Sequence, residues 1–110
     1  MGMTMAEKVL ARTSGRDSVK VGQVLECEVD QVVTVDLTFT LNDGIPTRVK
    51  APDRVTVVFD HCVPAPSVKD ADAMVLAREF TKKFGLRLFD VGQHGICHQV
   101  ILENAIALPG

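Results

Sequence analysis

Two histidine-containing segments carry the side chains best suited to chemistry in this sequence. Asp60 and His61 are adjacent and follow the apolar run 55–59, and His98 lies beyond a second short apolar run, 86–89. A carboxylate beside an imidazole fixes the tautomer of the ring and raises its proton affinity, which suits general acid catalysis. The residues alone leave a structural alternative open, in which the carboxylate caps a turn and both histidines have no catalytic role.

The cysteines and a short glycine-containing loop are weaker candidates. Cys62 and Cys97 each adjoin one of these histidines, which would suit a nucleophile or a metal site, although small buried thiols without such a role are common. The chain has three cysteines and no CxxC pair, so it matches neither a closed disulfide set nor a local zinc or cluster motif. The loop from Gly92 to Gly95 matches neither common phosphate-binding pattern, and His94 within it is expected on the surface.

The elements around these segments form one βαβ unit. Run 55–59 (VTVVF) is short, β-branched and apolar, as in strands that are covered on both faces. Ser67 is a suitable N-cap for a helix that ends near Phe84, and Gly85 is placed to cap its C-terminus. Run 86–89 is the second strand, and right-handed parallel pairing is expected between the two strands.

This arrangement predicts that the two histidine segments share one edge of the sheet. Functional groups of open parallel sheets gather just beyond the carboxyl ends of the strands. Asp60 and His61 occupy that position after the first strand, and the loop that leads to His98 does so after the second. Residues 96–104 are expected to be helical, which places His98 near a helix start, where a neutral imidazole is favoured.

The N-terminal part of the chain is predicted to hold a helix, a strand and a loop. Thr4 and Glu7 form a capping box for a helix that ends near residue 13, with Gly15 placed to close it. Apolar and acidic residues alternate from residue 24, which predicts a half-buried strand over 24–35. Residues 40–54 include an Asn-Asp-Gly turn sequence and two prolines, and should form a loop or a loose hairpin.

Composition narrows the classes of function. The chain has 110 residues, enough for one domain, with 46% hydrophobic and 24% charged residues. A net charge of −2 without a long basic run, together with the absence of Trp and Tyr, argues against a nucleic-acid partner. We expect no membrane association, because no apolar run reaches the length of a span, and a cytoplasmic location, because the start does not resemble a signal peptide.

Three blocks of the sequence resemble the large subunits of the aconitase and 3-isopropylmalate dehydratase family. The blocks are GMTMAEKVLARTSGR, DRVTVVFDHCVPAPS and LFDVGQHGICHQVILEN followed by LPG. The resemblance implies an α/β fold with a three-layer-type sheet and flanking helices, forming part of the first domain of the aconitase fold. Residues 1–110 would then be a single partial domain from the N-terminal part of a large subunit.

The family resemblance also implies an activity. Its members dehydrate and rehydrate hydroxy di- or tricarboxylic acids at a [4Fe-4S] cluster that acts as a Lewis acid, here in leucine biosynthesis. The cluster would belong to the full-length parent and not to this chain, because Cys27, Cys62 and Cys97 match none of the family's cluster ligands. The implied partners are the hydroxy-acid substrate and either a small, swivelling-domain subunit or further C-terminal domains.

Site residues follow from the same resemblance. Asp60 and His61 match a pair that helps to protonate the departing hydroxyl, and His98 matches a histidine that orders water and substrate. Further substrate contacts are implied for Asp36, Thr38 and Gln99.

Two other hypotheses remain beside a hydro-lyase segment. One is a non-catalytic binding or subunit-assembly module with the same fold. The other is a free-standing cysteine or metal-dependent enzyme that uses Cys97 and His98. If the chain is a piece of a larger protein, an exposed apolar face is expected, with Ile101, Ile106 and Leu108 on it.

Overall fold

The computed structural model describes residues 2–41 and 45–108. They fall into two compact units, one formed by residues up to Asp30 and one by Gln31–Leu108. The Asn-Asp-Gly turn expected at 42–44 lies outside the described residues. No helix of the described ranges has the length and apolarity that a membrane crossing requires.

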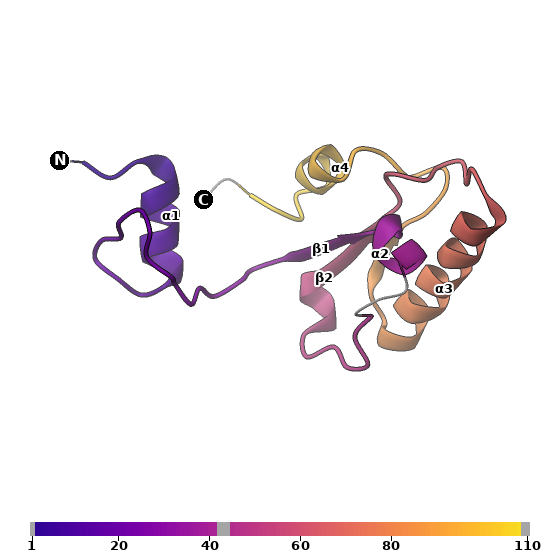
Figure 1. Cartoon of the computed structure of the whole chain (residues 1–110), viewed down its shortest axis with the longest axis horizontal. Helices are drawn as coiled ribbons and strands as arrows, with labels where there is room; N and C mark the ends of the chain where they lie inside the picture. Colours follow the sequence, from indigo (N-terminus) through magenta and orange to yellow (C-terminus); the bar gives the residue numbers. More distant parts are fainter. Residues whose placement is uncertain (1, 42–44, 109–110) are drawn as a thin grey trace. The chain divides into compact units, whose positions relative to one another are not determined.

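The N-terminal unit begins with the predicted helix. Helix α1 is Met5–Thr13 (Figure 1), and its capping box is confirmed: the Thr4 hydroxyl accepts from the Glu7 N–H, and the Glu7 carboxylate accepts from the Thr4 N–H at 2.7 Å. Ser14 is the C-cap, and Gly15 follows it in the left-handed region with φ of 65°. The sequence signals for both helix ends are therefore confirmed, with the cap itself one residue earlier than the glycine.

The predicted strand from residue 24 is wrong over most of its length. Residues 24–29 have no regular structure, and strand β1 is only Val32–Val35. Leu25 and Cys27 are half-buried and the glutamates beside them are exposed. The alternation therefore marks which side chains are covered, although the backbone forms no strand. The Glu28 N–H donates to the Thr13 carbonyl at the end of α1, so this backbone pairs with a helix end and does not join a ladder.

The larger unit contains a parallel sheet of three strands in the order β1-β2-β3. Strand β2 is Val55–Val58 and β3 is Arg87–Phe89, as predicted apart from end residues. The register pairs Val35 with Val58, and Val58 with Phe89, so the three strands end side by side. The central strand β2 is buried on both faces, which explains why its sequence is apolar apart from the buried Thr56.

Within residues 31–41 and 45–108, three α-helices and one 3₁₀ turn accompany the sheet. Helix α3 is Val68–Phe84 between the Ser67 N-cap and a left-handed Gly85, as predicted. Helix α4 is Cys97–Glu103, and the 3₁₀ turn is Pro52–Arg54. Helix α2, Asp36–Leu41, was not predicted, because its β-branched and aromatic residues are weak helix formers.

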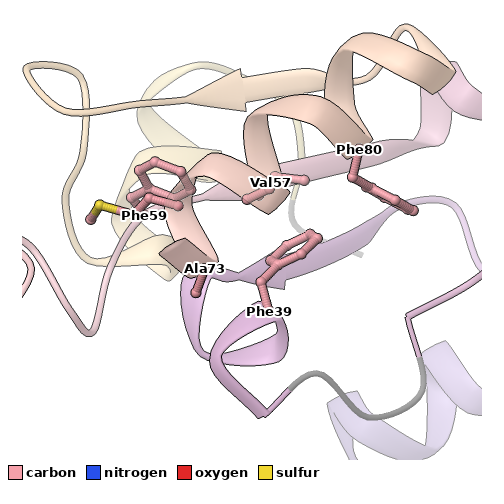
Figure 2. Packing of buried hydrophobic residues seen from close by; sticks show 7 residues of the cluster. Phe39, Val57, Phe59, Ala73 and Phe80 are labelled. Atoms are coloured by element: carbon pink, nitrogen blue, oxygen red, sulfur yellow. The ribbon is translucent and has the colours of Figure 1, made fainter. Parts of the chain in front are cut away.

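Alternate side chains of β2 bury against opposite layers. Val57 and Phe59 pack with Phe39 of α2 and with α3, whereas Val58 packs with Cys97 and Val100 of α4. Figure 2 shows Phe39, Phe80 and Val57 in this cluster. The rings of Phe39 and Phe80 meet edge to face, with centroids 5.5 Å apart. The sheet thus lies between α2 and α3 on one face and α4 on the other, which confirms the three-layer α/β expectation.

The expected exposed apolar face is present only in part. Leu108 is exposed, but Ile101 is half-buried against the Val58 layer and Ile106 is half-buried as well. Other apolar side chains of this region, Ile96 and Leu102, are exposed.

Candidate functional site

The candidate site lies where the parallel strands end. Because Val35, Val58 and Phe89 are in register, the residues that follow them emerge at the same edge of the sheet. The pairing extends one residue further, since the Phe59 N–H donates to the Phe89 carbonyl at 3.1 Å. Asp36, Asp60 and Asp90 therefore begin three adjacent segments at the carboxyl edge, the usual location of functional groups in such sheets.

Asp60 connects the end of β2 to the start of α4. Its carboxylate accepts a hydrogen bond of 2.9 Å from the N–H of Cys97, the first residue of α4. This bond lowers the pKa of Asp60 most, against an opposing effect of burial, and the Cys97 thiol and the charges of His61 and His98 lower it further. The Asp60 carboxylate therefore connects the loop that carries His61 to the helix start that carries His98.

Asp36 holds the loop that carries Asp60 and His61. It is the first residue of α2, and its carboxylate is 1% exposed. One oxygen accepts from the N–H groups of Asp60 and His61 at 3.2 and 3.1 Å, and the other accepts from the N–H of Cys62 at 2.5 Å. Both carboxylate oxygens are thus occupied by the backbone of the 60–62 loop.

The two catalytic candidates that carry imidazole rings remain accessible. The His61 side chain is 50% exposed, and its Nδ1 lies 3.8 Å from the inner oxygen of Asp36. His98, the second residue of α4, is exposed as well. The structure therefore provides two solvent-accessible rings, one in the loop that Asp36 holds and one in the first turn of the helix that Asp60 contacts; imidazoles in such positions are able to donate protons and to hold water.

The remaining predicted substrate contacts lie apart from this group. The Thr38 hydroxyl accepts from the hydroxyl of Thr34 at 2.9 Å, within the β1–α2 corner. The Gln99 amide donates to Glu103 at 2.8 Å along the surface of α4. Gln99 also lines an open cavity of about 450 Å³, whose lining includes His94 but none of the three catalytic candidates. The substrate contacts at these positions stay predictions.

An ion pair at the same edge was missed from the sequence. Arg78 of α3 donates two hydrogen bonds to Asp90, at 2.6 and 2.7 Å, and its guanidinium lies 5.5 Å from the centroid of the Phe59 ring. The bidentate contact lowers the pKa of Asp90. The two residues are twelve positions apart on different elements, so no local spacing signals the pair.

Burial and nearby carboxylates keep the two thiols of this region protonated. Burial raises the pKa of Cys62 most, followed by the negative charges of Asp70 and Asp36. Burial is also the largest cause of the raised pKa of Cys97, followed by its contact with Asp60. A nucleophilic cysteine needs the opposite shift, so these surroundings do not favour an enzyme that uses Cys97 with His98.

Alkylation kinetics test this point. We expect Cys62 and Cys97 to react with iodoacetamide at pH 8 about tenfold more slowly in the folded chain than in urea, because less thiolate is present and access is restricted. Peptide mapping by mass spectrometry resolves the individual cysteines. A folded-state rate at Cys97 equal to or above the unfolded rate would restore the nucleophile hypothesis.

The described residues do not form a ligand set for a metal or cluster. Within 2–41 and 45–108, no group of three or more His, Cys, Asp or Glu side chains is placed to hold a metal ion. The donor set of these residues therefore does not fit a [4Fe-4S] cluster.

The fold defines the class of domain, which is a parallel α/β domain with Asp60 at the carboxyl ends of its strands. Comparisons with known proteins then indicate its relatives. No protein-family model matches the chain. The chain is 47% identical to the 3-isopropylmalate dehydratase large subunit of Mycolicibacterium smegmatis, over 100% of the chain and 26% of that protein. It is 41% identical to the homoaconitase large subunit of Thermus thermophilus, over 100% of the chain and 27% of that protein.

A third relative gives the same result. The probable 3-isopropylmalate dehydratase large subunit of Methanothermobacter thermautotrophicus is 38% identical over 100% of the chain and 27% of its own length. The chain thus spans about a quarter of the length of the curated relatives it matches. Over its whole length it corresponds to a segment of large subunits named 3-isopropylmalate dehydratase and homoaconitase, which confirms the resemblance seen in the three sequence blocks.

Proposed function

We propose that this chain forms the proton-donating and water-ordering side of a hydro-lyase site. The parent enzyme would isomerise a hydroxy di- or tricarboxylic acid by dehydration and rehydration, in keeping with relatives named dehydratase and homoaconitase. The observation that carries the proposal is that Asp60 and His61 follow β2 at the edge where three parallel strands end, with the Asp60 carboxylate bonded to the N–H of Cys97, the residue before His98.

In this proposal each residue has a separate role. The lowered pKa of Asp60 keeps it ionised, so it orients neighbouring groups and leaves proton donation to an imidazole. His61 would give a proton to the departing hydroxyl oxygen, which leaves as water, and would regain a proton in the hydration step. His98, at the start of α4, would hold that water and the substrate by hydrogen bonds.

A [4Fe-4S] cluster, where the parent enzyme binds one, would be held by residues outside this chain. It would supply a Lewis acid that polarises the bond between the substrate carbon and its hydroxyl. The described residues would then contribute binding, orientation and proton transfer alone.

The wider context is proposed on the same basis. Relatives named large subunits point to a small subunit or further domains as partner, and we propose that residues 1–110 form part of the first domain of such an assembly. We propose a cytoplasmic enzyme of leucine biosynthesis, with isopropylmalate as the first substrate to test and homocitrate-type and dimethylmalate-type acids next.

A chimeric enzyme tests the proposal. This chain replaces the matching segment of the Mycolicibacterium smegmatis large subunit, and the product is assembled with its small subunit and cluster. We expect isopropylmalate turnover, followed by ultraviolet absorbance of the unsaturated acid. His61→Gln and His98→Asn should each lower kcat by about 100-fold or more, because each removes a group acting on the leaving hydroxyl or its water.

The matched control is His94→Gln, since His94 is an exposed histidine whose ring accepts from the Gly92 N–H. Its kcat should stay within about threefold of the unsubstituted chimera. An active chimera in which His61→Gln and His98→Asn behave like the control would contradict the catalytic roles. That result would favour the alternative of a non-catalytic binding or assembly module.

A further inference from the structure

We infer that Asp36 is a positioning residue for Asp60 and His61, and that it acts through the loop backbone without contacting the substrate. The inference rests on the proposed function, because positioning matters only if the pair reacts. Its first support is burial: the Asp36 carboxylate is 1% exposed, so a substrate in the open edge of the sheet has no access to it.

The second support is the way in which this buried charge is satisfied. A carboxylate removed from water is strongly unfavourable unless hydrogen bonds replace its solvation. Here three consecutive N–H groups, those of residues 60–62, supply the replacement. All three bonds are charge-assisted and reach across 24 to 26 residues of sequence, so they fix a segment that has no helix or strand of its own.

The third support is where the anchored backbone directs its side chains. Asp60 leaves the loop toward α4 and binds the Cys97 N–H, while His61 leaves it with Nδ1 3.8 Å from Asp36. A carboxylate on that side favours the tautomer with the proton on Nδ1. The other ring nitrogen, Nε2, is then unprotonated in the neutral ring and becomes the atom that gains and gives the catalytic proton.

The position of Asp36 follows from the sheet register. Val35 pairs with Val58, so the residue after β1 emerges beside the residue after β2. From this position the short side chain of Asp36 reaches the 60–62 loop that follows β2. Because α2 starts at Asp36, its carboxylate is also attached to a helix that packs on α3.

Two preparations test the inference. In the full 110-residue chain, hydrogen exchange and nitrogen NMR follow the amides of residues 60–62 and the His61 ring. In the chimeric enzyme, kcat and KM are measured over a range of pH. The variants are Asp36→Asn, which keeps the size but removes the charge, and Asp36→Glu. The control is Met74→Ala, a buried substitution on α3 that destabilises the same unit and removes none of the three bonds to Asp36.

For Asp36→Asn we expect exchange at residues 60–62 to rise at least about tenfold while α3 stays protected, and the Nδ1–H preference of His61 to weaken. In the enzyme, kcat per folded molecule should fall about tenfold with KM within about threefold, and the pH profile of kcat should change. Met74→Ala should raise exchange throughout the unit, with kcat per folded molecule and pH profile unchanged.

Other outcomes overturn the inference. Asp36→Asn could match Met74→Ala in every readout, which would make Asp36 a structural residue only. If neither Asp36→Asn nor Asp36→Glu folds, the role is again structural and the inference fails. A chimera that is inactive without any substitution at position 36 would instead contradict the proposed function, and the exchange and ring measurements on the chain would still decide whether Asp36 positions the loop.

Discussion

Replacing Phe59 with alanine is expected to lower the free energy of unfolding by about 3–5 kcal/mol. Phe59 is fully buried, directly after the central strand, and packs in the cluster with Phe39 and α3. Its ring also lies under the Arg78 guanidinium. The substitution removes all these contacts and leaves a cavity beside the candidate site. Urea unfolding followed by circular dichroism measures the change.

Two further variants make the result specific. Phe59→Leu keeps most of the buried volume and should lose roughly half as much stability or less. Val75→Ala changes an apolar residue of α3 that is 50% exposed, and should stay within about 0.5 kcal/mol of the unsubstituted chain. A loss for Phe59→Ala no larger than for Val75→Ala would mean that this layer of the core is packed differently.

The second large effect is expected from acid. Asp60 is bonded to the Cys97 N–H and Asp90 to Arg78, and both carboxyls have pKa values lowered below the model-compound value of 3.8. A lowered folded-state pKa means that the unfolded chain binds more protons in acid, so this stability is present above about pH 4 and is lost as the pH falls through the folded pKa values. Protonation of Asp60 and Asp90 should therefore weaken the hydrogen bond to the start of α4 and the ion pair with Arg78 over the same pH range.

The free energy of unfolding should therefore fall steeply below pH 4. Each group adds at most about 1.4 kcal/mol per pH unit, and Asp90 adds less because it is partly exposed and screened by solvent. Urea unfolding at several pH values between 6 and 2.5, about the range of these carboxyls, gives the slope. Asp90→Asn should reduce this slope. Asp72→Asn changes an exposed residue of α3 and serves as the control. Equal slopes in the unsubstituted chain, Asp90→Asn and Asp72→Asn would contradict the contribution of Asp90 to stability.

The β2–α3–β3 unit could be predicted from the sequence because its signals are local. An unbroken β-branched run, a serine N-cap, helical spacing and a C-terminal glycine together fix each element. The edge location of Asp60, His61 and His98 then followed from the general geometry of parallel sheets. Their roles came from the family resemblance, and they stay predictions.

The features that sequence reasoning missed depend on contacts between distant segments. The alternation over 24–30 predicted a strand, but a ladder also needs a neighbouring strand, and the Glu28 N–H binds the end of α1 instead. Helix α2 forms because Phe39 is buried against α3, although its residues are poor helix formers. The use of Asp36 as an anchor depends on the β1–β2 register, which no pattern near residue 36 reveals.

The three bonds to Asp36 also bear on how such a site changes over evolution. Each of them uses a main-chain N–H of residues 60–62, and any residue except proline supplies that group. These bonds themselves therefore require only that the residue at position 62 is not proline. A substitution there would keep the main-chain bonds that hold Asp60 and His61. Evolution can therefore vary the side chain at position 62 without losing the main-chain bonds that hold the loop.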